Sequence, residues 1–135
     1  MKIMVCHDGS KQSQEALEKA VKLFRCEKPE VVLITVVEEP LDATSMDETS
    51  FEKWRSARDG ELKKAANWVA DNGFNVDALL AVGDPRKMIL EAAESKSPDI
   101  LVVARRGAGI IEKMVLGSVS AYLVRHAACP VLVMH

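Results

Sequence analysis

The feature that most constrains this chain is a regular alternation of short apolar runs with segments of helical periodicity. Five runs resemble strands, and an amphipathic segment lies between each pair of them. Strict alternation of this kind predicts parallel strands joined by right-handed helical crossovers. We therefore expect an α/β fold: a doubly wound, open, five-stranded parallel sheet with helices on both faces, in the order β-α-β-α-β-α-β-α-β.

The strand predictions rest on residue type and on run length. Residues 31–37 read VVLITVV and give the strongest strand, because β-branched side chains favour extended backbone. Residues 2–7 lack a clean apolar–polar alternation, which is typical of a strand covered on both faces. The other strands are predicted at residues 74–82, 100–104 and 131–134.

The helix predictions rest on apolar spacing and on capping residues. Helices are expected over residues 11 to about 25, 51–71, 85 to about 95 and 117 to about 127. Ser10 and Asp84 are expected N-caps, and Pro85 fits the first helical position, where its missing N–H costs nothing. Asn72 and Gly73 predict a helix end, since both tolerate the left-handed conformation needed there.

The second helix is expected to follow a long polar connection. Residues 38–50 are polar and acidic and show no hydrophobic period, so a surface loop is predicted there. The side chains expected on the buried side of the helix after it are Trp54, Leu62, Ala65, Ala66 and Val69.

Size and charge narrow the class of protein. The chain has 135 residues, which predicts one domain over residues 1–135, and its formal net charge of -2 gives no general attraction to nucleic acid. No apolar run reaches the roughly 18–20 residues that a membrane span needs. The first residues, MKIMVCHDGS, do not resemble a signal peptide, so we expect a cytoplasmic protein without a membrane or nucleic-acid partner.

Cysteines and histidines do not predict a metal site or a disulfide framework. The cysteines are odd in number and widely spaced, and the histidines do not fall at zinc-ligand spacings. These residues are Cys6, Cys26, Cys129, His7, His126 and His135. Cys6 and Cys129 lie in apolar runs, which favours buried and inert thiols.

The unusual chemistry lies at the ends of two predicted strands. After residues 100–104 comes a basic, glycine-bearing turn, and Gly117, Ser118 and Ser120 then open a helix. Glycines admit a bulky anion close to the backbone, and a helix N-terminus offers free N–H groups, so we predict a phosphate site. In an open parallel sheet, ligands bind where the strand order reverses. If the first and fourth strands flank that point, Asp8 and the 104–118 segment face one cleft.

Each of these residues also has a purely structural explanation. Asp8 can act only as a turn former and helix cap, and Gly117 with Ser118 can form a plain helix start. Gly107 and Gly109 can serve tight turns alone. No serine or cysteine nucleophile pairs with His7 at a recognisable spacing, so no catalytic residue is predicted.

Several segments together resemble the universal stress protein family. They are VCHDGS after the first strand, VGDP before the third helix, and RGAGIIEKMVLGSVSAYLVRHAACPVLVM at the end, and the resemblance covers essentially the whole chain. Members that bind ATP typically show Gly-x-x-Gly, nine residues, and then Gly-Ser or Gly-Thr. Here Gly107, nine residues and Gly117-Ser118 match, and Ala104 stands at the first glycine. The fold implied is Rossmann-like, of the adenine nucleotide alpha hydrolase-like type.

The resemblance implies a site for ATP or AMP. Asp8 would accept hydrogen bonds from ribose hydroxyls or face a nucleotide-bound Mg²⁺, Val36 would line the adenine pocket, and Gly107 and Gly117 would offer N–H groups to phosphate. Ser118 would add a hydroxyl and its own N–H. The implied nucleotide-binding residues are Cys6, His7, Asp8, Val36, Ala104, Arg106, Gly107, Gly117, Ser118, Val119 and Ser120.

The function implied is that of an adenine-nucleotide-binding sensor or regulator in the stress response. Family members commonly dimerise through the last strand, and an apolar edge strand invites such pairing, so a homodimer through Val131, Leu132, Val133 and Met134 is expected. Two alternatives stay open. One is a slow ATPase, although no Walker lysine motif is present, and the other is a structural dimer whose pocket Ala104 closes.

Overall fold

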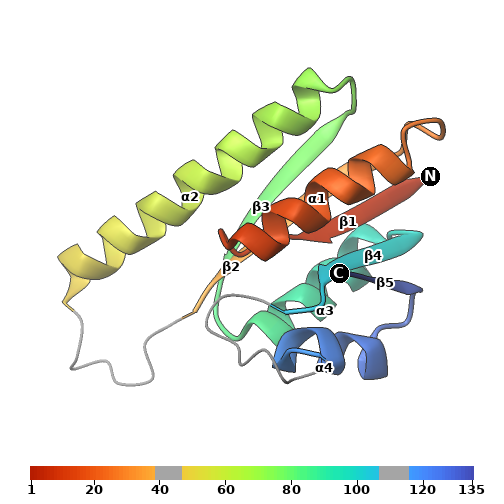
Figure 1. Ribbon diagram of the computed structural model, residues 1–135. Helices are drawn as coiled ribbons and strands as arrows, with labels where there is room; N and C mark the ends of the chain where they lie inside the picture. Colours follow the sequence, from red (N-terminus) through yellow and green to blue (C-terminus); the bar gives the residue numbers. More distant parts are fainter. Residues whose placement is uncertain (39–46, 107–115) are drawn as a thin grey trace.

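The computed structural model describes residues 1–38, 47–106 and 116–135, and its centre is a parallel sheet (Figure 1). The strands are β1 (Lys2–Cys6), β2 (Glu30–Val37), β3 (Val76–Val82), β4 (Ile100–Ala104) and β5 (Val131–Met134). They follow the order β3-β2-β1-β4-β5, and every pair is parallel. The predicted fold class is confirmed.

Helices cover both faces of the sheet. They are α1 (Lys11–Leu23), α2 (Glu48–Asp71), α3 (Pro85–Lys96) and α4 (Ser118–His126). Side chains of α1 and α2 pack on one face in one hydrophobic core, and side chains of α3 and α4 pack on the other face in a second core. Within the described residues, no helix is both long enough and apolar enough to cross a membrane.

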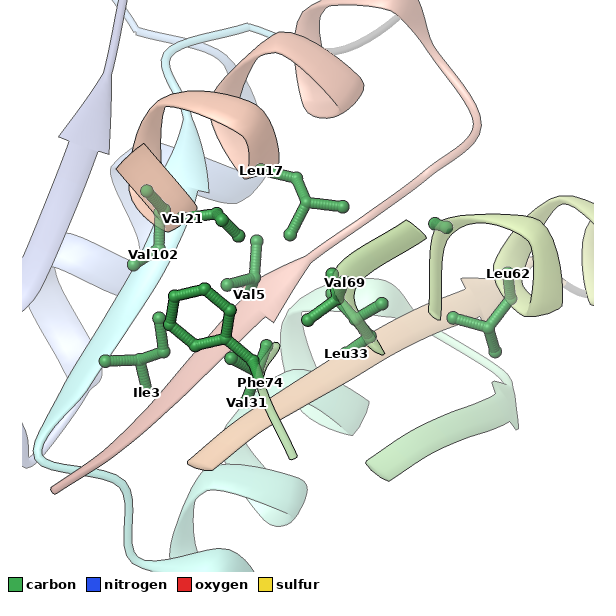
Figure 2. Packing of buried hydrophobic residues seen from close by; sticks show 12 residues of the cluster. Ile3, Val5, Leu17, Val21, Val31, Leu33, Leu62, Val69, Phe74 and Val102 are labelled. Carbon is green, nitrogen blue, oxygen red and sulfur yellow. The ribbon is translucent and has the colours of Figure 1, made fainter. Parts of the chain in front are cut away.

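The strand β1 contributes to both cores because its side chains alternate between the two faces. Ile3 and Val5 belong to the core under α1 and α2, whereas Met4 and Cys6 belong to the core under α3 and α4. Figure 2 shows the first of these cores, where the ring of Phe74 lies among aliphatic side chains of the sheet. Burial on both faces explains why the β1 sequence shows no apolar–polar alternation.

The strand order reverses between β1 and β4. From β1 the chain adds β2 and then β3 on one side, while β4 and β5 extend the other side. In register, Ile3 of β1 pairs with Val31 of β2 and with Ile100 of β4. The carboxyl ends of β1 and β4 therefore lie side by side, which is the condition under which Asp8 was expected to face the segment after β4. An open parallel sheet typically binds its ligands at such a point.

The predicted helix starts are confirmed at α1 and α3. The Ser10 side chain accepts a hydrogen bond from the Ser13 N–H at 3.1 Å, and Asp84 accepts one from the Arg86 N–H at 3.1 Å. Pro85 occupies the first turn of α3. These caps satisfy N–H groups that no carbonyl of the helix can reach.

The start predicted for α2 is wrong by three residues. The helix begins at Glu48 and not at Phe51, because the Asp47 carboxylate accepts a hydrogen bond from the Ser50 N–H at 2.7 Å and caps it. The predicted loop 38–50 is correspondingly shorter, and its residues 39–46 lie outside the described part of the chain.

Other element ends differ by one or two residues. The strand β1 ends at Cys6 instead of residue 7, and α1 ends at Leu23, with Phe24 as its C-cap. The strand β3 begins at Val76 rather than residue 74, because the Phe74 N–H bonds back to the Val69 carbonyl and Phe74 belongs to the turn after α2.

We expect Leu33→Ala to lower the free energy of unfolding by about 2–5 kcal/mol, because the substitution leaves a cavity in the core beneath α1 and α2. Leu33 is fully buried in β2, whereas Leu23, at the end of α1, is 60% exposed. Leu23→Ala is therefore the matched control and should change stability by no more than about 0.5 kcal/mol. Urea unfolding followed by circular dichroism measures both variants, and equal losses would contradict the assignment of this core.

Candidate ligand-binding site

A cavity of about 380 Å³ opens at the carboxyl end of the sheet, where the strand order reverses. Its volume falls in the range of small-molecule sites, which is about 300–1,000 Å³. The predicted site residues that line it are Cys6, His7, Asp8, Val36, Ala104, Arg106, Gly117, Ser118, Val119 and Ser120. Gly107 lies outside the described residues, so its predicted place in the site stays a prediction.

The start of α4 forms one wall of the cavity. Gly117 is the N-cap, and its N–H donates to the Arg105 carbonyl at 2.8 Å. The Ser120 hydroxyl donates to the same carbonyl at 2.8 Å, which fastens the helix to the end of β4. The cap makes no side-chain hydrogen bond, and Ser118 is exposed in the first turn. The positive end of the helix dipole is therefore presented to the cavity without a capping side chain.

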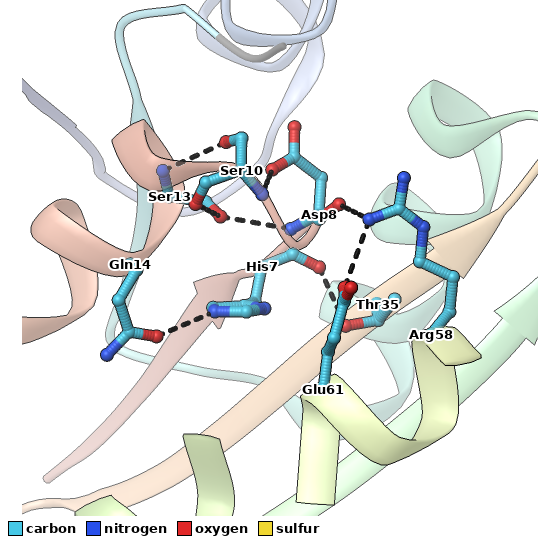
Figure 3. A network of polar contacts seen from close by, with 8 residues as sticks. All are labelled: His7, Asp8, Ser10, Ser13, Gln14, Thr35, Arg58 and Glu61. Atoms are coloured by element: carbon cyan, nitrogen blue, oxygen red, sulfur yellow. Dashed lines mark hydrogen bonds and ion pairs between the residues drawn. The ribbon is translucent and has the colours of Figure 1, made fainter. Parts of the chain in front are cut away.

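Asp8 lies directly after β1 and is exposed at the mouth of the cavity. Its carboxylate accepts a hydrogen bond from the Ser10 N–H at 2.8 Å (Figure 3). Partial burial of the carboxylate acts to raise its pKa, but the hydrogen bonds from Ser10 and Ser13 and the neighbouring His7 together hold the pKa below its ordinary value. Asp8 is thus an ionised hydrogen-bond acceptor at neutral pH.

His7 is buried next to Asp8 and takes part in the same network. Its Nε2 lies 2.9 Å from the Gln14 amide oxygen, and its carbonyl accepts a hydrogen bond from the Thr35 hydroxyl at 2.7 Å. Because an amide oxygen only accepts, this contact places the ring hydrogen on Nε2. Nδ1 is also buried, and among the described residues it has no hydrogen-bond partner. The His7 ring is therefore hydrogen-bonded to a side chain of α1 and not to a serine or cysteine nucleophile.

Cys6 lines the cavity, but its thiol is unreactive. Burial raises the pKa of Cys6 to about 12, and the negative charge of Asp8 adds to the effect. Since the thiolate is the nucleophilic form, the thiol is inert at neutral pH.

Ala104, which is predicted to stand at the first glycine of the motif, has no backbone strain. It is the last residue of β4 and pairs in register with Met134 of β5. The non-glycine residues described with a positive φ are Lys28 and Ser97, so the backbone at residue 104 does not require glycine. The alanine methyl group lines the cavity, which retains its volume of about 380 Å³.

The turn after β1 is held in place by a side chain from α2. The Arg58 guanidinium donates to the Asp8 carbonyl and contacts the Glu61 carboxylate at 3.1 Å (Figure 3). Gly9 follows Asp8 with φ +82°, and a Cβ atom at this residue would collide with the side chains of Arg58 and Glu61. Glycine is therefore favoured at residue 9 by its backbone angle, and the flexible ends of the Arg58 and Glu61 side chains would have to shift to admit a Cβ atom.

Sequence reasoning missed the part of the cavity that α2 and α3 supply. Trp54 was expected to pack in the core but is half-buried and lines the cavity, together with Arg58. Pro85 and Ile89 of α3 line it too, although the sequence indicates only a helix start and a core residue there. The further lining residues are Ser13, Ile34, Glu38 and Val103.

The cavity combines an apolar interior with charged groups. Val36, Ile89 and Val103 offer aliphatic surface, while Asp8 and Arg58 bring charges of opposite sign. Such a lining suits a ligand with a flat apolar part and a polar, charged part.

These features define an α/β protein with a cavity at the switch point of a doubly wound parallel sheet. The chain belongs to the universal stress protein family, whose family pattern matches residues 1–135. A relative is universal stress protein YxiE of Bacillus subtilis, which is 31% identical in an alignment 143 residues long. The alignment covers 98% of this chain and 97% of YxiE.

Solved structures of family members share the fold. Universal stress protein UspA from Lactobacillus plantarum superposes with a TM-score of 0.86 at 23% identity, over 100% of this chain and 97% of UspA. A universal stress protein family protein from Arabidopsis thaliana, solved with AMP bound, superposes with a TM-score of 0.72 at 23% identity. That alignment covers 99% of this chain and 90% of the Arabidopsis chain.

We expect Gly9→Ala to destabilise the protein by more than about 1 kcal/mol, because a left-handed backbone and the Arg58 side chain both oppose a methyl group there. Gly60→Ala is the matched control, since Gly60 lies inside α2 with no atom within 4 Å of the added carbon. The control should gain about 0.5–1 kcal/mol from its better helix propensity. Thermal and urea unfolding measure both, and a neutral Gly9→Ala variant would contradict the left-handed backbone assigned to residue 9.

Proposed function

We propose that this protein binds an adenine nucleotide, ATP or AMP, in the cavity at the end of β1 and β4 and acts as a sensor or regulator in the stress response. The observation that carries the proposal is the meeting of three unlike groups in one cavity. These are the ionised Asp8, the uncapped start of α4 at Gly117 and Ser118, and the apolar wall at Val36. The AMP bound in the Arabidopsis relative supports the choice of ligand.

The residues present fit the parts of such a ligand. N–H groups at the start of α4 suit phosphate oxygens, because this end of the helix carries positive dipole charge. The Asp8 carboxylate can accept hydrogen bonds from ribose hydroxyls, and it is the acidic group that would face Mg²⁺ carried on the phosphates. Val36 would face the adenine ring, and Gly107 keeps its role at the phosphates in this proposal.

The cavity geometry favours binding over the two alternatives. A structural dimer with a closed pocket requires the Ala104 methyl to fill the site, yet the cavity keeps about 380 Å³ with that methyl in its wall. Dedicated ATP hydrolysis needs a placed base or water-orienting group. Among the described residues His7 bonds Gln14 through its ring, and the Cys6 thiol is protonated. Neither is set up for that role, so the ATPase alternative depends on the Asp8 carboxylate as its base.

We expect isothermal titration calorimetry to detect ATP and AMP binding to the wild-type protein, measured with and without Mg²⁺. Ala104→Gly should bind with equal or higher affinity, because it removes a methyl group from the cavity wall. Gly117→Val should lose at least about tenfold in affinity, since a branched side chain at the N-cap obstructs the approach of phosphate to the helix start.

Gly60→Val is the control for a valine introduced at an exposed glycine, and it should bind like the wild type. Absence of binding by both wild type and Ala104→Gly at millimolar nucleotide would overturn the proposed function. Linear release of phosphate from ATP that is lost in Asp8→Ala would instead establish the ATPase alternative.

The proposal includes a homodimer formed through β5 and a cytoplasmic location. The strand β5 is an edge of the sheet, and its residues Val131–Met134 are only half-buried. Pro130 and Met134 turn their carbonyls toward β4, so alternation along the strand turns the backbone groups of Val131 and Val133 toward the free edge. An apolar edge of this kind can pair with a second copy.

We expect sedimentation equilibrium to give the mass of two chains for the wild type and of one chain for Val133→Pro. Proline removes an N–H from the free edge while leaving the pairing with β4 intact. Val133→Thr keeps the β-branched shape and the N–H, so this variant should stay dimeric. A monomeric wild type at tens of micromolar protein would contradict this part of the proposal.

A further inference from the structure

One face of α2 is turned into the ligand cavity. Trp54 and Arg58 are four residues apart, which places both on one side of the helix, and both line the cavity. The residues between and beside them, among them Lys53, Arg55 and Ser56, are exposed. In the first half of α2 the half-buried residues are these two, Phe51 and Asp59, and the others are exposed.

Trp54 does not pack as a core residue of this helix would. Further along α2, the core is formed by Leu62, Ala65 and Val69, which are 0–4% exposed. Trp54 instead remains half-buried, and its ring meets Phe51 edge to face at 6.1 Å between centroids and an interplanar angle of 79°. An edge-to-face neighbour supports the ring and leaves indole surface for another flat group. That surface borders the same cavity as Val36, the residue proposed to face the adenine ring.

Arg58 fixes the position of this part of α2. Its guanidinium bridges the Asp8 carbonyl, on the turn after β1, and the Glu61 carboxylate, one turn further along the helix. In Figure 3 the Arg58 side chain reaches from α2 toward the turn at Asp8. Because Gly9 has no side chain, the guanidinium can lie against this turn. The contact links the helix that carries Trp54 to the strand end that carries Asp8.

We propose that Trp54 is a specificity-determining residue that stacks on the purine base of the bound nucleotide, and that Arg58 is a positioning residue that holds Trp54 over the cavity. This inference rests on the proposed nucleotide function and adds the element that recognises the base. The purine is a flat, polarisable ring, and stacking on tryptophan accepts such a ring without reading its hydrogen-bonding edge. The site should therefore distinguish ligands with a base from ligands without one.

The test for Trp54 first removes the other tryptophan of the chain, Trp68, so that fluorescence comes from Trp54 alone. In a Trp68→Phe background, Trp54 is the sole tryptophan, so its fluorescence reports on the cavity. AMP and adenosine should quench this emission, whereas ribose 5-phosphate, which has no base, should leave it unchanged. In calorimetry, Trp54→Leu should weaken AMP binding by about 5- to 150-fold, the range expected for one lost stacking contact. Trp54→Phe should stay within a few-fold of wild type.

The outcomes separate this inference from the function on which it rests. If wild type and Trp54→Leu bind AMP equally and AMP leaves the Trp54 emission unchanged, the stacking role is overturned while nucleotide binding stands. If the wild type binds neither AMP nor ribose 5-phosphate, both proposals fail. An equal loss of AMP and ribose 5-phosphate affinity in Trp54→Leu would also overturn base stacking, because it would indicate a general disturbance of the site.

The role of Arg58 is tested by measuring how accessible the Trp54 ring is to a quencher in solution before ligand is added. In the single-tryptophan background, Arg58→Met should increase quenching of Trp54 by acrylamide and weaken AMP binding several-fold, and Arg58→Lys should restore part of both. Arg55→Met is the matched control, since Arg55 lies on the exposed side of α2 with only the Glu52 carboxylate, at 3.7 Å, as its ion-pair partner among the described residues. Acrylamide quenching that is identical in all variants would overturn the positioning role.

Discussion

The structure depends on β1 being enclosed on all sides. It is hydrogen-bonded to β2 along one edge and to β4 along the other, and helices cover both of its faces. Its side chains divide between two cores that lie under different pairs of helices, and the residue after it, His7, is itself buried. A strand held in this way has little freedom at its end. The position of Asp8 is therefore set by the same burial that stabilises the sheet, with Arg58 and Ser10 fixing the turn that follows.

The sequence predicted those parts of the fold that have local causes. The β-branched run of β2, the serine cap of α1 and the Asp84-Pro85 start of α3 each rest on the intrinsic preferences of a few neighbouring residues. The side chains that gather at the ends of β1 and β4 were also predictable, because parallel strands end at the same edge of a sheet. Asp8 and Ser118, which are 110 positions apart in the sequence, were therefore expected in one cavity on the condition that β1 and β4 flank the reversal of strand order, and the sheet meets this condition.

The parts that sequence reasoning missed depend on how α2 lies across the sheet. The start of α2 was not predicted correctly because its cap, Asp47, is one of several acidic residues in a polar stretch. That stretch has no hydrophobic period that would distinguish Asp47 from its neighbours as a cap. Trp54 has the spacing of a core residue, and only the packing of Leu62 and Val69 further along the helix decides that it reaches the cavity. Arg58 taken alone gives no signal, since an arginine on a polar helix face is ordinarily solvated. One indication was present: a tryptophan four residues before an arginine, ahead of an aliphatic series that was already long enough to cover the sheet.

The pairing of β1 with β4 also has a consequence for how the chain acquires its structure. Ile3 lies opposite Ile100, so one edge of the central strand stays open until nearly three quarters of the chain is available. The preceding strands can join the sheet in sequence order, because β2 pairs with β1 and β3 pairs with β2. Closure at β4, however, spans a long loop and carries its entropy cost. During synthesis on a ribosome, β1 is therefore an unprotected sheet edge for most of that time. The cavity lies where β1 meets β4, so its lining is complete only when the last third of the chain has joined the first.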